Sequence, residues 1–290
     1  MSHGGAAPVV CTLFICGLLA VGCVGQEPRS TSVGGSDQAG LDEDSLSDRI
    51  AAAAVVDLSY PFDEQTIYWP TAGRFELIRE SAGYTDAGYY YAANRFAAAE
   101  HGGTHLDSPI HFFEGGDTTD EIPLSKLIGK GVVVDVSDLC ADNPDFQITI
   151  DDLERWEEEH HRALTGSLVL LKTGWGRFWP HRETYLGTAE TGEAAVPKLH
   201  FPGLAPEAAE WLTEERSILA VGIDTASIDF GQSRLFGSHV ALFKHNTPVF
   251  ENVANLNRLP PFGFILVALP MKIGGGSGGP LRIVALIDRQ

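Results

Sequence analysis

Three histidines and an aspartate lie close together in the segment His101-Gly-Gly-Thr-His105-Leu-Asp107-Ser-Pro-Ile-His111. Imidazole nitrogens and a carboxylate oxygen suit Zn²⁺ and other borderline divalent ions. A histidine that is not needed as a ligand can transfer protons near neutral pH. The segment therefore predicts a metal site with a proton-transfer group beside it.

The conformation of this segment decides which side chains can meet. On a helix, the spacing of His101 and His105 would place both rings on one face. The glycine pair at 102 and 103 and the proline at 109 disfavour a helix. In an extended strand, His105, Asp107 and His111 share one face, and His101 folds back to them through the Gly-Gly turn. The opposite face, pointing into a core, would carry Leu106, Ile110 and Phe112.

A structural role is the alternative reading of these histidines, in which they are only hydrogen-bonded groups. One histidine alone would favour that reading. Several polar groups that converge in a mostly apolar segment favour a site, because burying them is unfavourable unless they have partners.

The segment His101–Phe112 also resembles the H-x-G-T-H-x-D-x-P-x-H-F motif of the cyclase family, which includes bacterial kynurenine formamidases and isatin hydrolases. The resemblance covers roughly residues 53 to 288. It continues through the segments Val56–Ser59, Leu171–Trp175, Phe201–Leu204, Val221–Asp229 and Leu269–Ile273. It implies a swivelling β/β/α fold and a homodimer.

The resemblance also implies a ligand set. His101, His105 and Asp107 would hold a first metal, with Asp107 bridging to a second. His239 and Glu251 stand at the twelve-residue spacing that completes a binuclear zinc site in the formamidases. Other members of the family work with one metal, so we expect one or two ions, with Zn²⁺ first and Mn²⁺ as the alternative.

The function implied by the resemblance is hydrolysis of a non-peptide C–N bond in a small-molecule amide. Water activated by the cation would attack the carbonyl, and His111 would act as general acid and base. The expected activity is that of an arylformamidase, which converts N-formylkynurenine to kynurenine and formate. Tyr68 and Trp69 are expected to contact the substrate, with core packing as the alternative.

Two other functions stay open. One is ring opening of a cyclic amide or lactone, as in the isatin hydrolases. The other is a lipoprotein that binds a metal or a solute without catalysis. The intact His111 argues against the second, because metal binding alone needs no proton shuttle.

The pattern along the chain predicts one α/β domain with a mixed sheet over residues 50–290. Short apolar runs bounded by breakers are typical of buried strands. They occupy Val55–Ser59, Gly131–Val136, Leu168–Leu171, Ile218–Ile223, Phe264–Leu269 and Leu281–Ile287. Helices are expected over Thr149–His160 and Ala205–Glu215, the second with a proline in its first turn.

The N-terminus is typical of an export signal over residues 1–23. The apolar run from Pro8 to Val24 contains small residues before Cys23, as in the signal of a bacterial lipoprotein that is lipidated on that cysteine. An ordinary secretory signal or an uncleaved anchor is the alternative. Residues 24–49 are rich in Ser, Gly, Asp and Glu and predict a flexible linker. We expect an exported protein at the cell envelope, otherwise periplasmic or secreted.

The charge of the chain narrows the choice of partners. Its formal net charge is −19, from 39 acidic against 20 basic residues, and no basic run occurs. Binding to phosphates requires clustered Lys and Arg, so the sequence argues against a nucleic acid partner. Contact with a membrane is expected only through the N-terminal lipid.

Overall fold

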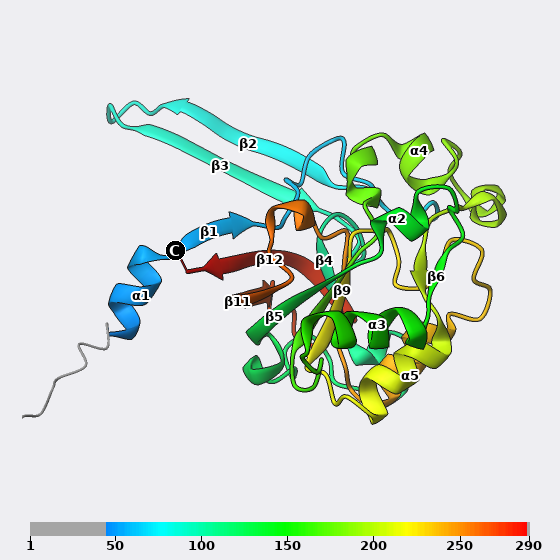
Figure 1. The fold of residues 1–290 in the computed structure, drawn as a ribbon. Coiled ribbons are helices and arrows are strands. Elements are labelled where there is room, and N and C mark those ends of the chain that lie inside the picture. The colour runs from blue at the N-terminus through cyan, green and yellow to red at the C-terminus, as the bar shows by residue number, and fades with distance from the viewer. Residues whose placement is uncertain (1–44, 289–290) are drawn as a thin grey trace, which may run out of the picture. The chain divides into compact units, whose positions relative to one another are not determined.

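The computed structural model describes residues 45–288, in which strands alternate with helices (Figure 1). The strands are β1 (Ala54–Asp57), β2 (Glu76–Tyr84), β3 (Tyr90–Ala97), β4 (His105–Asp107), β5 (Ile128–Asp135), β6 (Gln147–Ile148), β7 (Leu168–Lys172), β8 (Gly203–Leu204), β9 (Ala220–Ile223), β10 (Val249–Glu251), β11 (Phe262–Pro270) and β12 (Gly278–Ile287). The α-helices are α1 (Leu46–Ala52), α2 (Ser137–Cys140), α3 (Ile150–His160), α4 (Arg182–Leu186), α5 (Pro206–Glu214) and α6 (Gly237–Lys244). Short 3₁₀ helices are η1 (Pro109–His111), η2 (Leu124–Lys126), η3 (Trp175–Phe178), η4 (Glu193–Lys198) and η5 (Leu256–Arg258).

The large sheet closes on itself as a barrel. Its strand order is β1-β12-β11-β5-β7-β9-β10-β4, and β4 pairs with β12 as well as with β10. Neighbours from β5 through β10 are parallel, whereas β11, β12 and β4 pair antiparallel with their neighbours. This arrangement confirms the predicted α/β class with a mixed sheet.

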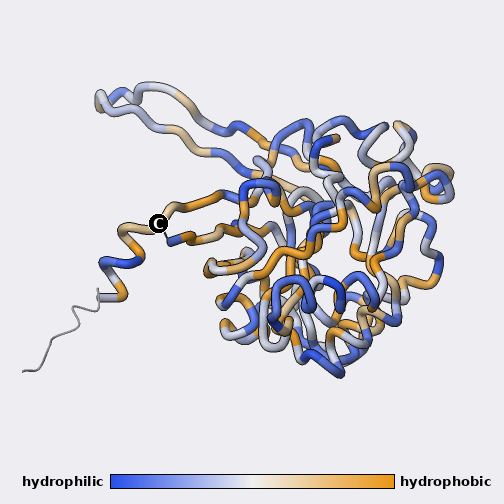
Figure 2. Tube along the Cα trace, in the orientation of Figure 1, coloured by the Kyte–Doolittle hydropathy of each residue, from blue (hydrophilic) through white to orange (hydrophobic). Residues whose placement is uncertain are grey.

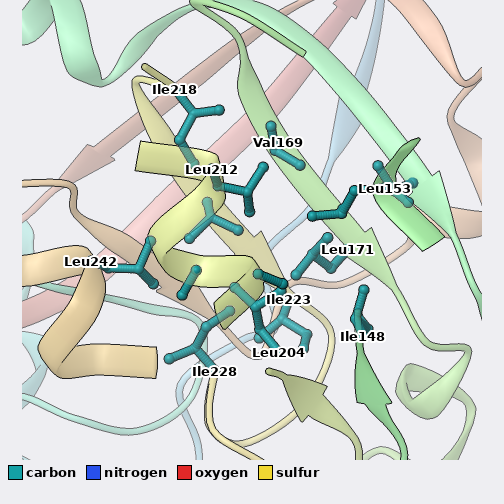
Figure 3. Close-up of a cluster of buried hydrophobic side chains, with 14 of the residues drawn as sticks. Ile148, Leu153, Val169, Leu171, Leu204, Leu212, Ile218, Ile223, Ile228 and Leu242 are labelled. Atoms are coloured by element: carbon teal, nitrogen blue, oxygen red, sulfur yellow. The ribbon is translucent and has the colours of Figure 1, made fainter. Parts of the chain in front are cut away.

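Two apolar cores lie on opposite faces of the same strands. Alternation along β7 sends Val169 and Leu171 to one face and Leu168 and Leu170 to the other. The first face packs against α3, α5 and α6 (Figure 3). The second face meets side chains from β4, β11 and β12 and fills the barrel. Hydrophobic residues accordingly follow the central strands, and hydrophilic residues gather on helices and loops (Figure 2).

The predicted helices form close to their expected bounds. Thr149 caps α3, accepting a hydrogen bond from the backbone N–H of Asp152, whose carboxylate accepts one in return from the N–H of Thr149. Pro206 stands in the first turn of α5. A backbone N–H at this position would have no partner within the helix, so proline removes no hydrogen bond there. Each predicted strand overlaps an observed strand.

The hairpin of β2 and β3, drawn in cyan in Figure 1, is an element that the buried-strand pattern does not predict. Most of its residues are exposed on both faces, so no apolar run marks them. Large side chains are exposed on it as well, among them Tyr84, Tyr90 and Tyr91.

The N-terminal predictions lie mostly outside the described residues. The signal segment, Cys23 and most of the predicted linker precede residue 45. The last linker residues, 46–49, belong to α1, which Ser45 caps through the backbone N–H of Asp48. Within residues 45–288, no helix is both long enough and apolar enough to span a membrane.

Candidate metal centre

The Gly-Gly pair before His105 has a packing role and a backbone role. Gly102 bridges to Tyr68, and a Cβ on Gly102 would lie 2.0 Å from the Tyr68 ring. Gly103 has a φ of +58°, in the left-handed region that glycine adopts without strain. The pair thereby brings His101 back toward the strand that follows, as the sequence predicts.

Strand β4 presents His105 and Asp107 to the site and Leu106 to the barrel core. Its antiparallel pairing with β10 places Glu251 directly opposite His105. This register explains how a glutamate far along the chain joins the cluster, and it brings together two of the predicted ligands.

The extended conformation predicted as far as His111 is wrong beyond Asp107. Proline 109 begins a 3₁₀ turn, η1, because its fixed φ suits the first turn of a helix. His111 therefore reaches the site through this turn and not through strand alternation. The expectation for Phe112 is also wrong in part, since its ring borders the site cavity as well as the core.

His239 enters from the first turn of α6. Its Nδ1 lies 2.6 Å from Oδ2 of Asp229, and its backbone N–H donates to the same oxygen. The N–H of Ser238 donates to the other oxygen of Asp229. Asp229 therefore fixes the ring of His239 and leaves its Nε2 facing the cluster, as a carboxylate does behind many metal-binding histidines.

Asp107 is the meeting point of the predicted ligands. Its Oδ1 lies 2.6 Å from His101 Nδ1 and 3.0 Å from His105 Nε2, and its Oδ2 lies 3.1 Å from His239 Nε2. Glu251 closes the set, 3.2 Å from His239 Nε2 and 3.5 Å from His105 Nε2. All five predicted ligands are thus within one cluster, and Asp107 contacts three of them.

The protonation equilibria of this cluster reflect its burial. Burial alone would raise the pKa of the Asp107 carboxyl, but His105 and His101 hold it well below its usual range. Burial alone would lower the pKa of His105, yet Asp107 and Glu251 raise it to about 9. Burial, and then the charge of Asp107, raise the pKa of Glu251. The site therefore concentrates negative charge that a cation can neutralise.

The residues present fit a divalent cation. Nε2 of His105 is fully buried and 3.0 Å from Asp107, but it forms no hydrogen bond with any described residue. Nδ1 of the same ring is directed at the carbonyl of Gly103, 2.9 Å away. Two sets of donor atoms share Asp107, and within each set all atoms lie within 4.8 Å of one another. One set comes from His105, Asp107 and Glu251, and the other from His101, Asp107 and His111. Mixed nitrogen and oxygen donors of this kind suit a transition metal.

His111 stacks on His101, with ring centroids 3.8 Å apart. Burial lowers the pKa of His111 to about 4, so its ring is neutral at pH 7. Its nitrogen also belongs to one of the two donor sets. The geometry is compatible with a proton shuttle and with a metal ligand.

A cavity of about 280 Å³ opens above the cluster. Both predicted substrate contacts, Tyr68 and Trp69, line it, and so do residues that the sequence reasoning missed. These include Ala226 and Phe236, which lie far along the chain from the motif. No local motif marks these two residues, because they meet the cluster only in the folded chain.

Comparisons with known proteins identify the family of this chain. The family model described as "Putative cyclase" matches residues 56–230. An isatin hydrolase of Roseibium aggregatum is 34% identical over 73% of this chain and 81% of its own length, and a kynurenine formamidase of Bacillus anthracis is 27% identical over 79% and 95%. The solved structure of isatin hydrolase A from Labrenzia aggregata bound to benzyl benzoate has a TM-score of 0.73 and 33% identity, covering 82% of this chain and 95% of its own. The chain therefore belongs to the cyclase family of metal-dependent hydrolases.

Proposed function

We propose that this protein opens the ring of a small aromatic cyclic amide by hydrolysis, with isatin as the first substrate to test. The observation that carries the proposal is the convergence of three histidines on Asp107, with Glu251 beside two of them, at the base of an aromatic cavity. The chain also resembles an isatin hydrolase more strongly, at 34% identity, than a kynurenine formamidase, at 27%. For this reason the cyclic amide takes precedence over the linear formamide expected from the sequence.

The five ligands would hold one or two cations, with Zn²⁺ first and Mn²⁺ as the alternative. His101, His105, Asp107, His239 and Glu251 would supply the nitrogen and oxygen ligands, with Asp107 in contact with the three histidines. Such a cation makes water more acidic and polarises a carbonyl.

His111 would move the protons of the reaction. The oxygen of water bonds to the amide carbon, and His111 accepts the proton released. The C–N bond then breaks, and His111 returns this proton to the leaving nitrogen. In a cyclic amide, the amine and the carboxylate remain in one product.

Tyr68 and Trp69 would bind the substrate. The Tyr68 side chain is 2% exposed, and its hydroxyl is buried without a hydrogen-bond partner among the described residues. Burial raises the pKa of this phenol to about 12, so the hydroxyl keeps its proton and can donate to a substrate oxygen. The Trp69 ring, packed edge-on against Phe201, offers an aromatic wall.

Hydrolysis of N-formylkynurenine is the second candidate. The kynurenine formamidase of Bacillus anthracis is matched over 95% of its length, and an aryl formamide presents the same amide group as a cyclic aryl amide. The two candidate reactions would use the same ligand residues and the same proton-transfer residue, His111. They differ in how the cavity holds the amine that leaves the carbonyl carbon.

The decisive experiment compares both substrates with the metal-loaded protein. We expect the kcat/KM for isatin to exceed that for N-formylkynurenine by at least about tenfold, the discrimination available from a shaped apolar pocket. A preference for the formamide would favour the second candidate. If the protein hydrolyses neither substrate and no related lactam or lactone, the proposal is overturned.

The cellular setting is proposed from the sequence alone. We infer export with lipidation of Cys23, so that the domain is tethered at the cell envelope. We also infer a homodimer, as the family resemblance implies. Light scattering of the purified domain would test the second inference, with a single-chain mass as the contrary result.

A further inference from the structure

Tyr185, on the short helix α4, reaches the back of the metal cluster although it is no part of the cavity wall. Its ring is fully buried. Its hydroxyl lies 3.0 Å from the carbonyl oxygen of Asp224 and 2.9 Å from Oδ1 of Asn252. Both of these atoms can only accept hydrogen bonds, so the single proton of the Tyr185 hydroxyl is shared between them.

The orientation of the Asn252 amide follows from its second contact. The side-chain nitrogen of Asn252 lies 2.8 Å from the carbonyl oxygen of Gly103, which accepts only. The NH₂ group therefore faces Gly103, and the amide oxygen faces Tyr185. Asn252 is held on its backbone too, since its N–H donates to Thr225 and its carbonyl accepts from Thr104.

The same Gly103 carbonyl faces His105, with 2.9 Å between its oxygen and Nδ1 of the ring. Because this oxygen only accepts, Nδ1 carries the proton. Nε2 is then the ring nitrogen left to bind a metal. Tyr185, Asn252 and the Gly103 carbonyl thus form an unbroken chain of hydrogen bonds that ends on a predicted ligand.

We propose that Tyr185 and Asn252 are positioning residues that fix the ring of His105 for metal binding through the Gly103 carbonyl. This inference rests on the proposed metal site. It gives α4 a role in the metal centre through the hydrogen bond from Tyr185 to Asn252.

The geometry explains why so many polar groups are buried here. Gly103 has a positive φ and belongs to neither a strand nor a helix, so no regular backbone hydrogen bond holds its carbonyl in place. Asn252 also has a positive φ, of 53°, a conformation that asparagine tolerates better than most residues. A buried network in which every member has a partner is rigid, and this one is complete from Tyr185 to His105.

The test compares Tyr185→Phe with Tyr60→Phe in the full-length protein. Tyr60 is a matched control, since it belongs to the same aromatic cluster through its stacking on Trp179, which in turn packs on Tyr185. Its hydroxyl donates to the carbonyl of Gly176 and has no link to His105. Asn252→Gly is the second variant, because glycine accepts the positive φ and adds no charge.

The readout is the dissociation constant for Zn²⁺, measured by chelator competition, together with the visible spectrum of the Co²⁺-loaded protein. We expect Asn252→Gly to weaken Zn²⁺ binding about tenfold or more, within the roughly 10- to 100-fold range for outer partners of metal ligands. Tyr185→Phe should weaken it less, by several-fold, because Tyr185 lies one hydrogen bond further from His105. Both variants should alter the Co²⁺ spectrum. Tyr60→Phe should change neither the Zn²⁺ dissociation constant nor the Co²⁺ spectrum.

The outcomes separate this inference from the proposed function. Wild-type protein that binds no metal would overturn both. Wild-type binding with Tyr185→Phe and Asn252→Gly indistinguishable from Tyr60→Phe would overturn only the positioning role. In the Asn252→Gly background, Tyr185→Phe should add little, because both act along one path. Additive losses would show that Tyr185 acts through Asp224 instead, which also contradicts the proposal.

Discussion

Asp107 is the residue on which the account of the metal site depends. Three histidines contact its two oxygens, and each approaches from a different part of the fold: the Gly-Gly turn, β4 and α6. A carboxylate so surrounded stays ionised, because the histidines lower its pKa in spite of its burial. An ionised carboxylate of this kind is a suitable ligand for a divalent cation.

The roles of His105 and His111 can be separated by mutation. We expect His105→Ala to lose metal and activity together. His111→Ala should keep most of its metal and lose about 10²- to 10⁴-fold in kcat, the usual share of a general acid or base. Metal content and kcat are measured on the same preparations. If His111→Ala loses its metal as His105→Ala does, His111 is a ligand.

Gly102 supports the substrate cavity through Tyr68. In Gly102→Ala the added Cβ would meet the Tyr68 ring at 2.0 Å, so the ring must move. We expect a loss of about 1–3 kcal/mol in the free energy of unfolding, as for other overpacked sites, and a higher KM. Gly73→Ala is the control, because no atom lies within 4 Å of its new Cβ. Equal behaviour of the two variants would show that Tyr68 has no fixed position.

At the scale of elements, the sequence predicts the helices and strands that are marked by apolar periodicity and by helix-capping residues. The buried strands and the two amphipathic helices follow from apolar runs and from Thr149 and Pro206. The exposed hairpin and the 3₁₀ turn at His111 do not, because the hairpin buries little and the turn interrupts an extended pattern. The ligand cluster was predictable as far as residues 101–111, whereas His239 and Glu251 came only from the family resemblance.

Asp229, Asn252 and Tyr185 show why the rest of the site was not predictable. Each acts on a residue brought near by the tertiary fold, such as Asp229 on His239, and no spacing in the sequence marks such pairs. Aspartate and asparagine after a buried strand are more often turn residues, so their types alone indicate nothing.

The cap of α3 should matter for global stability. Thr149→Ala removes a capping box on a helix that buries Leu153 and Trp156, so we expect a loss of about 1 kcal/mol in the free energy of unfolding. Denaturant titration measures this loss. Ser45→Ala removes the cap of α1, which has no buried residues, and should leave global unfolding unchanged. A larger loss in Ser45→Ala would mean that α1 contributes to the core.

At the scale of the whole molecule, we propose export from the apolar segment that ends at Cys23. We expect Cys23→Ala to leave the protein unanchored while its catalytic rate is unchanged, since lipid attachment would hold the protein at the membrane without contacting the site. Fractionation of cells that express the two forms is the measurement. Native protein found in the cytosol with residues 1–23 intact would contradict export.

The most direct test of the whole account is the metal content of active, full-length protein purified without chelator. The account predicts one or two equivalents of Zn²⁺ or Mn²⁺ per chain. It also predicts loss of amide hydrolysis when a chelator removes the metal and recovery when metal is restored. Full activity in protein that elemental analysis shows to contain no transition metal would contradict it.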